Sequence, residues 1–257
     1  MNKIKMKLSA RLILAAIFLC SIAGISDAEE SIGISLYYGE NAQIEIVSPG
    51  GIHVFVDVHD PSAVSCPGGE RDILCTSHHH PDHISAMRED FTGKQLDAKA
   101  GSIASGDVKV TSIMSAHNSA DEFVAEGGSN YIFLIETAGM RIAHFGDIGQ
   151  ETLTREQLDK LGRIDIAVMQ FDNAYSSMDV RNKKGFNLMK QLNPRMIIPS
   201  HISDDAVEIL GKTYASCYSR KSPLKILKET LPEKTSVLFL GITAALNGKR
   251  VKAKEFK

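Results

Sequence analysis

The most informative segment of the sequence reads Ser77-His78-His79-His80-Pro81-Asp82-His83. It contains the pattern His-x-His-x-Asp-His, and imidazole and carboxylate groups are the ligands that zinc and similar ions prefer in proteins. Side chains alternate along an extended chain, so His78 and His80 project to the same side and His79 faces away. Because Pro81 ends the strand, Asp82 and His83 begin a new element and are directed at a neighbouring ion.

An exposed run of histidines with adventitious metal affinity is the simplest alternative, and it would suffice for a single histidine. Four ligand-type residues at this spacing, directly after the predicted strand Asp72–Ser77, favour a built metal site instead. We expect the preceding Asp60-Pro61 to contribute to the floor of that site.

The hydrophobic pattern predicts mainly strands in the first half of the chain and alternating strands and helices in the second. Turn residues Ser48-Pro49-Gly50-Gly51 separate two β-prone runs and indicate a hairpin. The predicted strands are Ala42–Val47, Ile52–Val58, Asp72–Ser77, Val108–Ser115, Tyr131–Glu136, Arg141–Phe145, Ile164–Gln170, Arg195–Ser200 and Ser236–Gly241, and the predicted helices are Glu151–Leu161, Asn182–Leu192 and Asp204–Leu210. We therefore expect a mixed α/β layered fold in which helices cover sheets.

The N-terminal segment has the three parts of a secretory signal: a basic start, the apolar run Leu12–Ile25, and small residues in Ser26-Asp27-Ala28. The apolar run is shorter than the roughly 20 residues that a membrane-spanning helix needs, and an uncleaved anchor is the alternative. We predict that residues 1–28 are a signal peptide and that 29–257 form one domain. The domain is expected to be exported, to the periplasm or the medium, without stable membrane association after cleavage.

Charge and cysteine content limit the partners and cross-links of the exported chain. The formal net charge of −2 becomes about −5 when residues 1–28 are removed, which argues against a nucleic-acid partner. We expect a small-molecule substrate, and the sequence indicates no particular oligomeric state. Cys66, Cys75 and Cys217 remain, so one disulfide pair could form and one thiol would be left over.

Three further motifs follow the histidine segment. His117 follows a predicted strand in Ser115-Ala116-His117-Asn118-Ser119, Asp147 follows Phe145-Gly146, and His201 ends Ile198-Pro199-Ser200-His201. With these motifs in this order, residues 40–245 resemble the metallo-β-lactamase-fold hydrolase superfamily. Within it, they resemble the branch that contains ascorbate-6-phosphate lactonase and the N-acylphosphatidylethanolamine phospholipase D enzymes.

The resemblance implies an αββα sandwich, with two mixed β-sheets flanked by helices, and a binuclear metal site. His78, His80 and His117 would hold one ion, Asp82, His83 and His201 would hold the other, and Asp147 would bridge both. The ions are expected to be divalent, with zinc as the default and manganese or iron as alternatives. Relatives with a redox di-iron site have Glu at the position of His80, and some lactamases have a Cys ligand where this chain has Asp147, so neither activity is the default.

The implied function is that of an exported hydrolase in which a metal-bridging hydroxide attacks an ester-like bond, in a lactone, a carboxylic ester or a phosphodiester. Asp82 and Asp147 would accept or relay a proton while they bind metal. Alternatives are a β-lactamase or thioester hydrolase, and a non-catalytic metal-binding protein.

Other polar residues have weaker signals. Asn173, Tyr175 and Arg181 follow the predicted strand Ile164–Gln170, and we expect them to border the substrate pocket unless this loop is merely solvated. Tyr175 could donate to an oxyanion, and Arg181 could hold an anion. We interpret the remaining histidines near strands as structural or exposed, namely His53, His59 and His144.

Overall fold

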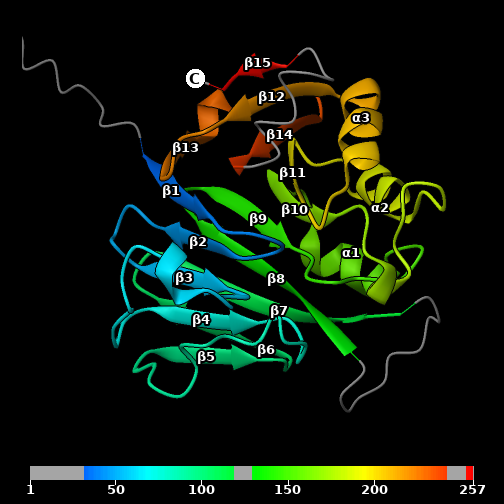
Figure 1. Cartoon of the computed structure of the whole chain (residues 1–257). Coiled ribbons are helices and arrows are strands. Elements are labelled where there is room, and N and C mark those ends of the chain that lie inside the picture. The colour runs from blue at the N-terminus through cyan, green and yellow to red at the C-terminus, as the bar shows by residue number, and fades with distance from the viewer. Residues whose placement is uncertain (1–31, 119–128, 242–252, 257) are drawn as a thin grey trace, which may run out of the picture. The chain divides into compact units, whose positions relative to one another are not determined.

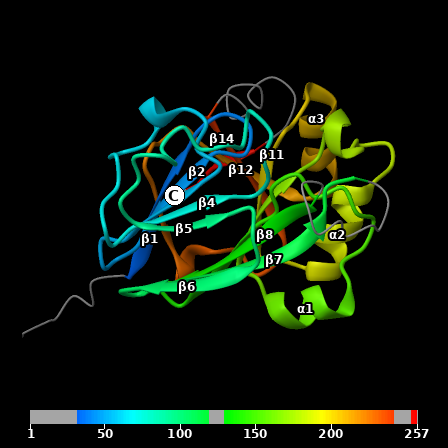
Figure 2. The same ribbon diagram turned by 90° about the horizontal axis from the view of Figure 1, so that it is seen from below.

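The computed structural model describes residues 32–118, 129–241 and 253–256. The predicted signal peptide, residues 1–28, lies outside the described residues. The described chain forms two facing β-sheets, and three α-helices gather along one side of them (Figures 1 and 2).

The first sheet has the strand order β13-β1-β2-β3-β4-β5, and the hairpin β2–β3 is antiparallel as predicted. β3, β4 and β5 run parallel to one another, so the sheet is mixed. Its strands are β1 (Gly33–Tyr38), β2 (Ile44–Val47), β3 (His53–Val56), β4 (Ile73–Thr76), β5 (Lys94–Asp97) and β13 (Leu224–Leu227).

The second sheet has the order β15-β12-β14-β11-β10-β9-β8-β7-β6. β6 to β9 pair antiparallel, whereas β9, β10, β11, β14 and β12 pair parallel. Its strands are β6 (Gly101–Ser105), β7 (Val108–Ala116), β8 (Ser129–Thr137), β9 (Met140–His144), β10 (Ile166–Gln170), β11 (Met196–Ser200), β12 (Ala215–Ser219), β14 (Ser236–Leu240) and β15 (Lys254–Glu255).

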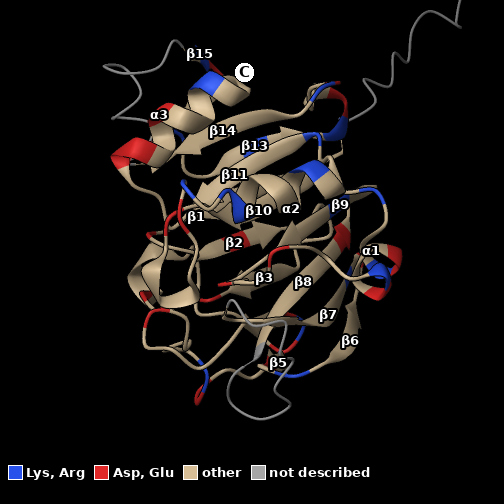
Figure 3. Ribbon diagram, turned by 90° about the vertical axis from the view of Figure 1, so that its right-hand side faces the viewer, with Lys and Arg blue, Asp and Glu red and all other residues tan. Residues whose placement is uncertain are grey.

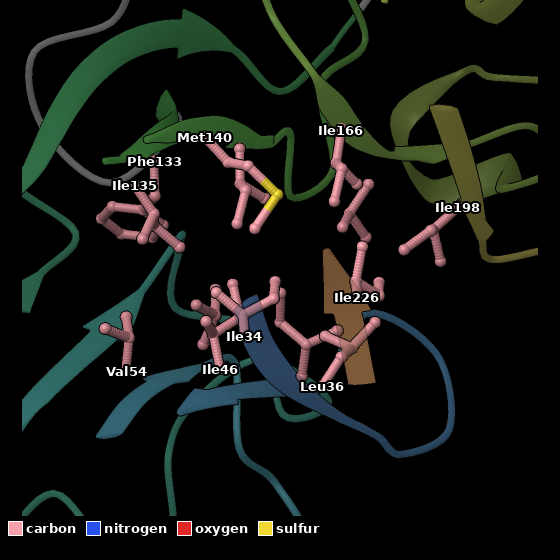
Figure 4. Close-up of a cluster of buried hydrophobic side chains, with 14 of the residues drawn as sticks. Ile34, Leu36, Ile46, Val54, Phe133, Ile135, Met140, Ile166, Ile198 and Ile226 are labelled. Carbon is pink, nitrogen blue, oxygen red and sulfur yellow. The ribbon is translucent and has the colours of Figure 1, made fainter. Parts of the chain in front are cut away.

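The main core lies between the two sheets, where alternate residues of each strand face inward. Figure 4 shows Ile34 and Ile46 from the first sheet facing Ile135, Met140 and Ile166 from the second. The residues between them in sequence, such as Ile132 and Leu134 on β8, belong to a second core on the other face of the second sheet. Strands of the second sheet such as β8 are therefore apolar on both faces, because each face packs against a different core.

Helices cover that other face of the second sheet. They are α1 (Arg155–Leu161), α2 (Lys184–Leu192) and α3 (Asp204–Thr213), and apolar residues of each join the second core. α1 begins four residues later than predicted, because Thr154 caps its N-terminus in a capping box with Gln157. α3 has acidic residues in its first turn and Lys212 in its last, which Figure 3 shows as red and blue ends that complement the helix dipole.

The outer face of the first sheet is covered differently. Phe55 and Leu74 pack there against Met87 and Phe91 from the segment that follows the histidine motif. The described residues of this layer form turns and one short 3-10 helix, Pro61–Ala63, instead of an α-helix. Met87 and Phe91 of this cover therefore come shortly after His78 to His83 in the sequence.

The predicted fold class, an α/β sandwich of two mixed sheets, is confirmed. Each predicted strand and helix is present with boundaries shifted by a few residues, while β1, β5, β6, β12, β13 and β15 were not predicted. Cys66, Cys75 and Cys217 are free thiols, so the disulfide pair left open by the sequence does not form. None of the described helices combines the length and apolar character needed to cross a membrane.

Candidate metal centre

The predicted ligand residues follow strand ends that meet at one edge of the two sheets. His78 comes two residues after β4, Asp147 three residues after β9, and His201 directly after β11. β9, β10 and β11 are parallel, so their carboxyl ends lie at the same edge. His117 directly follows β7, which pairs antiparallel with β8.

His78, His80, His117 and Asp147 form what we call the first group. One donor atom of each lies within 4.8 Å of the others. The three imidazole rings form a triangle, because each pair of ring centroids is 4.6 Å apart. Asp147 Oδ2 lies 3.7 Å from His78 Nε2 and 3.8 Å from His117 Nε2. His80 is exposed, whereas the other three residues are buried.

Asp82, His83 and His201 form the second group, with donor atoms also within 4.8 Å of one another. His83 Nε2 and His201 Nε2 are 3.2 Å apart, and each is 3.2 Å from Asp147 Oδ1. Asp82 Oδ2 is 3.7 Å from His83 Nε2. Asp147 therefore directs one carboxylate oxygen at each group, as expected for a residue between two ions.

The donor atoms fit divalent cations. Ligands at zinc distances of about 2.05 Å in a tetrahedron lie about 3.3 Å apart, close to the separations of 3.2 to 3.8 Å around Asp147. His78 Nε2, His117 Nε2 and Asp147 Oδ1 are buried and have no hydrogen-bond partner, which is costly unless another group binds there.

Hydrogen bonds at Nδ1 orient three of these imidazoles, those of His78, His83 and His117. His83 Nδ1 donates to Asp57 Oδ2 at 2.8 Å, His78 Nδ1 to Ser77 Oγ at 3.0 Å, and His117 Nδ1 to Asn118 Oδ1 at 3.2 Å. We assign the protons from this network: the Ser77 hydroxyl donates to Asp57 Oδ2, so it accepts from His78. The Nε2 atoms of the three rings are then directed at the two groups.

Asp57 is the functional residue that the sequence analysis missed. Its carboxylate is fully buried after β3 and also accepts the backbone N–H of Ser77 at 2.7 Å. Its backbone has φ of 50°, an uncommon conformation for a residue other than glycine. The sequence signal for it was a single acidic residue, Asp57, inside the otherwise mainly apolar run Ile52–Val58.

The electrostatic field of the groups favours positive charge next to Asp147 and Asp57. Although burial disfavours the imidazolium, the Asp57 and Asp147 carboxylates raise the pKa of His83 to about 10. Burial, and then the charge on His83, lower the pKa of His78 to about 3. Burial opposes ionisation of Asp147, yet the neighbouring imidazoles, His83 first, hold its pKa well below the ordinary value. Burial also lowers the pKa of His117 and of His201.

Asp147 is positioned by its own neighbours. Its backbone N–H donates to Asn130 Oδ1 at 2.9 Å, and Asn173 Nδ2 donates to its Oδ2 at 2.7 Å. Gly146 has φ of 52°, and a Cβ there would collide with Asn130 and with Ser77. Only glycine therefore allows the turn that brings Asp147 to both groups.

Two cavities border the groups. One, of about 490 Å³, is lined by His80, Pro81, Asp82, Asp147 and Tyr175. The other, of about 590 Å³, lies beside His201 and is lined also by Tyr38, His59 and Asp60.

The three predicted substrate residues differ in their positions. Tyr175 is 85% exposed at the first cavity, and Asn173 is buried against Asp147. Arg181 is exposed and belongs to the lining of neither cavity.

Two other histidines, His79 and His144, lie as the sequence indicated. His79 faces away and contacts Asp97 at 2.9 Å. His144 is fully buried, donates from Nε2 to Ala42 O at 2.7 Å and accepts the Gly146 N–H at Nδ1, so both ring nitrogens are satisfied. Burial lowers the pKa of His144, which is consistent with a neutral structural residue.

Comparisons with known proteins agree with this fold. Residues 35–201 match the family described as "Beta-lactamase superfamily domain". A candidate Zn-dependent hydrolase of the metallo-beta-lactamase superfamily from Thermotoga maritima has 19% sequence identity and a TM-score of 0.55, with 81% of this chain and 100% of that chain covered. The metallo-beta-lactamase fold protein YhfI from Bacillus subtilis has 12% identity and a TM-score of 0.51, with 80% and 96% covered. Igni18, a metallo hydrolase from Ignicoccus hospitalis, has 16% identity and a TM-score of 0.50, with 66% and 83% covered.

A search of curated proteins with this sequence found no match. The similarities to solved structures, at these identities, concern the fold. The family match spans more than half of the chain and includes all residues of the first and second groups. The chain therefore belongs to the beta-lactamase superfamily.

Proposed function

We propose that the protein is a hydrolase that binds two divalent ions in the first and second groups and cleaves an ester-like bond of a small molecule. The main support is the convergence of donor atoms from four separate segments, with buried Nε2 atoms of His78 and His117 left unpaired. Zinc is the ion proposed, because both groups consist of imidazole and carboxylate; manganese and iron are the alternatives.

When bound, two such ions supply a water of lowered pKa and polarise the carbonyl or phosphoryl oxygen of the substrate. The two acidic residues then have different roles. Asp147 is buried, and its lowered pKa keeps it ionised between the groups at neutral pH. Asp82 has a side chain that is 42% exposed at the cavity, so it can accept a proton and release it to solvent.

The cavity beside Asp82 and Tyr175 supports a small-molecule substrate, since its volume of about 490 Å³ lies in the range of ligand pockets. We propose that the Tyr175 hydroxyl donates to an oxygen of the substrate. The resemblance to the lactonase and phospholipase D branch supports lactones and phosphodiesters as the first compounds to test, followed by carboxylic esters.

Metal content and turnover test the proposal together. The purified protein, reconstituted with zinc, should contain two equivalents that depend on the first and second groups, and it should hydrolyse at least one compound in a panel of lactones, carboxylic esters and phosphodiesters. His78→Ala and Asp147→Ala should each lose metal and activity. His79→Ala is the matched control, because His79 lies in the same segment but faces Asp97, and it should retain both.

Several outcomes would contradict the proposal. Less than one equivalent of metal, unchanged in the two variants, would exclude a metal site in these groups. Turnover confined to nitrocefin or thioesters would indicate a β-lactamase or thioester hydrolase. Tight metal binding without turnover of any compound would indicate a non-catalytic metal-binding protein.

We also propose that the protein is exported after loss of residues 1–28. The basic and apolar N-terminal sequence supports this proposal. Mass analysis of the protein recovered from a periplasmic extract should show a chain that begins at Glu29, whereas an intact chain in the membrane fraction would indicate an anchor.

A further inference from the structure

A further cluster of residues of metal-binding types, separate from the first and second groups, lies on the outer face of the first sheet. Glu45 is on β2, His53 begins β3, and Cys66 is in the loop that covers these strands. Val47 pairs with His53 and Glu45 with Phe55, so Glu45 and His53 are diagonal neighbours on one face of the hairpin. One donor atom of each of Glu45, His53 and Cys66 lies within 4.8 Å of the other two.

The donor atoms of the three residues lie close together. His53 Nδ1 is 2.6 Å from Glu45 Oε1 and 3.6 Å from Cys66 Sγ. The Glu45 side chain is completely buried, while 22% of the His53 side chain is exposed and Cys66 is half-buried, so an ion and a water molecule can reach the cluster. Thiol, imidazole and carboxylate are all ligand types of zinc, and here their donor atoms lie close together.

We propose that Glu45, His53 and Cys66 form an additional binding site for a thiophilic divalent ion of the zinc type, with solvent as the fourth ligand. At zinc distances of about 2.3 Å to sulfur and 2.05 Å to nitrogen, a tetrahedral site places these two atoms about 3.6 Å apart. Cys66 Sγ and His53 Nδ1 already have this separation of 3.6 Å. The shorter distance between His53 and Glu45 is that of a hydrogen bond, whose proton the ion would replace.

Neighbouring contacts hold the three side chains in place before any ion binds. The His53 ring stacks on Phe55 with centroids 5.8 Å apart, and its backbone N–H donates to Asp72 Oδ1 at 2.8 Å. Glu45 accepts the backbone N–H of Ser65 at 2.7 Å and the Ser65 hydroxyl. Binding would thus need little reorganisation, and the ion would connect the hairpin β2–β3 to the covering loop.

A buried ion pair between Glu45 and His53 is the competing explanation, and it needs no role for Cys66. Cobalt distinguishes the two explanations, because thiolate coordination gives an intense charge-transfer band in the near ultraviolet that imidazole and carboxylate ligands do not give. The first and second groups contain no cysteine, so the band would report this site alone.

The experiment is a cobalt titration of the full-length protein, followed in the ultraviolet. We expect a thiolate band whose amplitude at saturating cobalt corresponds to one cobalt–thiolate bond per chain, and which disappears in Cys66→Ser and His53→Gln and persists in Cys217→Ser. Cys217 is the matched control because it is also half-buried but lies on β12 in the second sheet. Activity on the substrate found for the main site should remain in Cys66→Ser.

A measurement on the unaltered chain covers the case in which a variant fails to fold. Zinc at about ten times its Kd should slow alkylation of Cys66 about tenfold, as judged by peptide mass analysis, and leave Cys217 unaffected. No thiolate band at saturating cobalt, a band that survives Cys66→Ser, or unprotected Cys66 would each overturn the proposal and leave the ion-pair explanation. None of these results depends on whether the main site is a hydrolase.

Discussion

Replacing Asp57 with asparagine should keep the size of the side chain but replace the acceptor of the His83 hydrogen bond with a donor. In the structure, Oδ1 accepts the Ser77 N–H, and Oδ2 accepts from the Ser77 hydroxyl and from His83 Nδ1. The asparagine amide keeps the first bond, but its NH₂ then faces the N–H of His83. The imidazole would move its proton to Nε2, the nitrogen that is needed for the ion.

The size of the effect follows from that single lost acceptor. Removing a hydrogen-bond partner of a metal-binding histidine costs ten- to hundred-fold in metal affinity, or about 1.4 to 2.8 kcal/mol. Asp165→Asn is the matched control, because Asp165 is also buried and accepts the backbone N–H of Arg141 at 3.0 Å, but at the opposite end of β10. It should destabilise the chain without a change in metal affinity.

Competition with a chromophoric chelator at neutral pH measures both affinities, and circular dichroism shows that each variant is folded. Zinc binding by Asp57→Asn that stays within about twofold of the unaltered protein would refute the reasoning, because Asp57 would then not set the tautomer of His83. An equal loss in Asp165→Asn would also refute it, because the loss would follow from general destabilisation.

Three further predictions concern stability. Thr154→Ala removes the cap of α1, which Gln157 completes, and should lower the unfolding free energy in urea by about 1 kcal/mol; an unchanged midpoint would argue against the capping box. Ile46→Ala opens a cavity in the core between the sheets and should cost about 2 to 5 kcal/mol by the same assay, whereas a loss below 1 kcal/mol would mean that the sheets close around the gap. Burial opposes ionisation of Asp107, but hydrogen bonds from the Ser48 hydroxyl and the Gly50 N–H hold its pKa below the ordinary value. The stability that the ionised Asp107 contributes is therefore present at neutral pH and is lost as the pH falls through that lowered pKa. Asp107→Asn should therefore cost less than about 1 kcal/mol at pH 7 and nothing at acidic pH in parallel urea titrations, and a cost independent of pH would exclude this origin.

The sequence predicted the site better than it predicted the sheet edges. His78 to His83 lie in one segment, so their alternation was readable locally, whereas His117, Asp147 and His201 were recognised only by resemblance. The structure brings all of them together. Whether they bind metal stays a prediction, as does any contact of Arg181 with substrate.

The missed strands depend on partners that are distant in sequence. β12 contains Ala215-Ser216-Cys217-Tyr218-Ser219, which has little strand propensity of its own, and it forms because it pairs with β14. β15 has only two residues and exists through β12. β1 alternates between buried and partly exposed residues, and it is held in the sheet by pairing with β2 and with β13, which is far away in the sequence.

The first sheet has no α-helical cover in the described residues, and this affects how the protein would be degraded. The segment that shields Phe55 and Leu74 contributes Met87 and Phe91 and begins with His78 to His83. Binding of ions at these histidines would favour the closed segment over its opened form, because only the closed form assembles the full set of ligands. Chelators should therefore expose protease cleavage sites between residues 79 and 93. The rate at which proteases degrade the protein would then depend on the concentration of available metal.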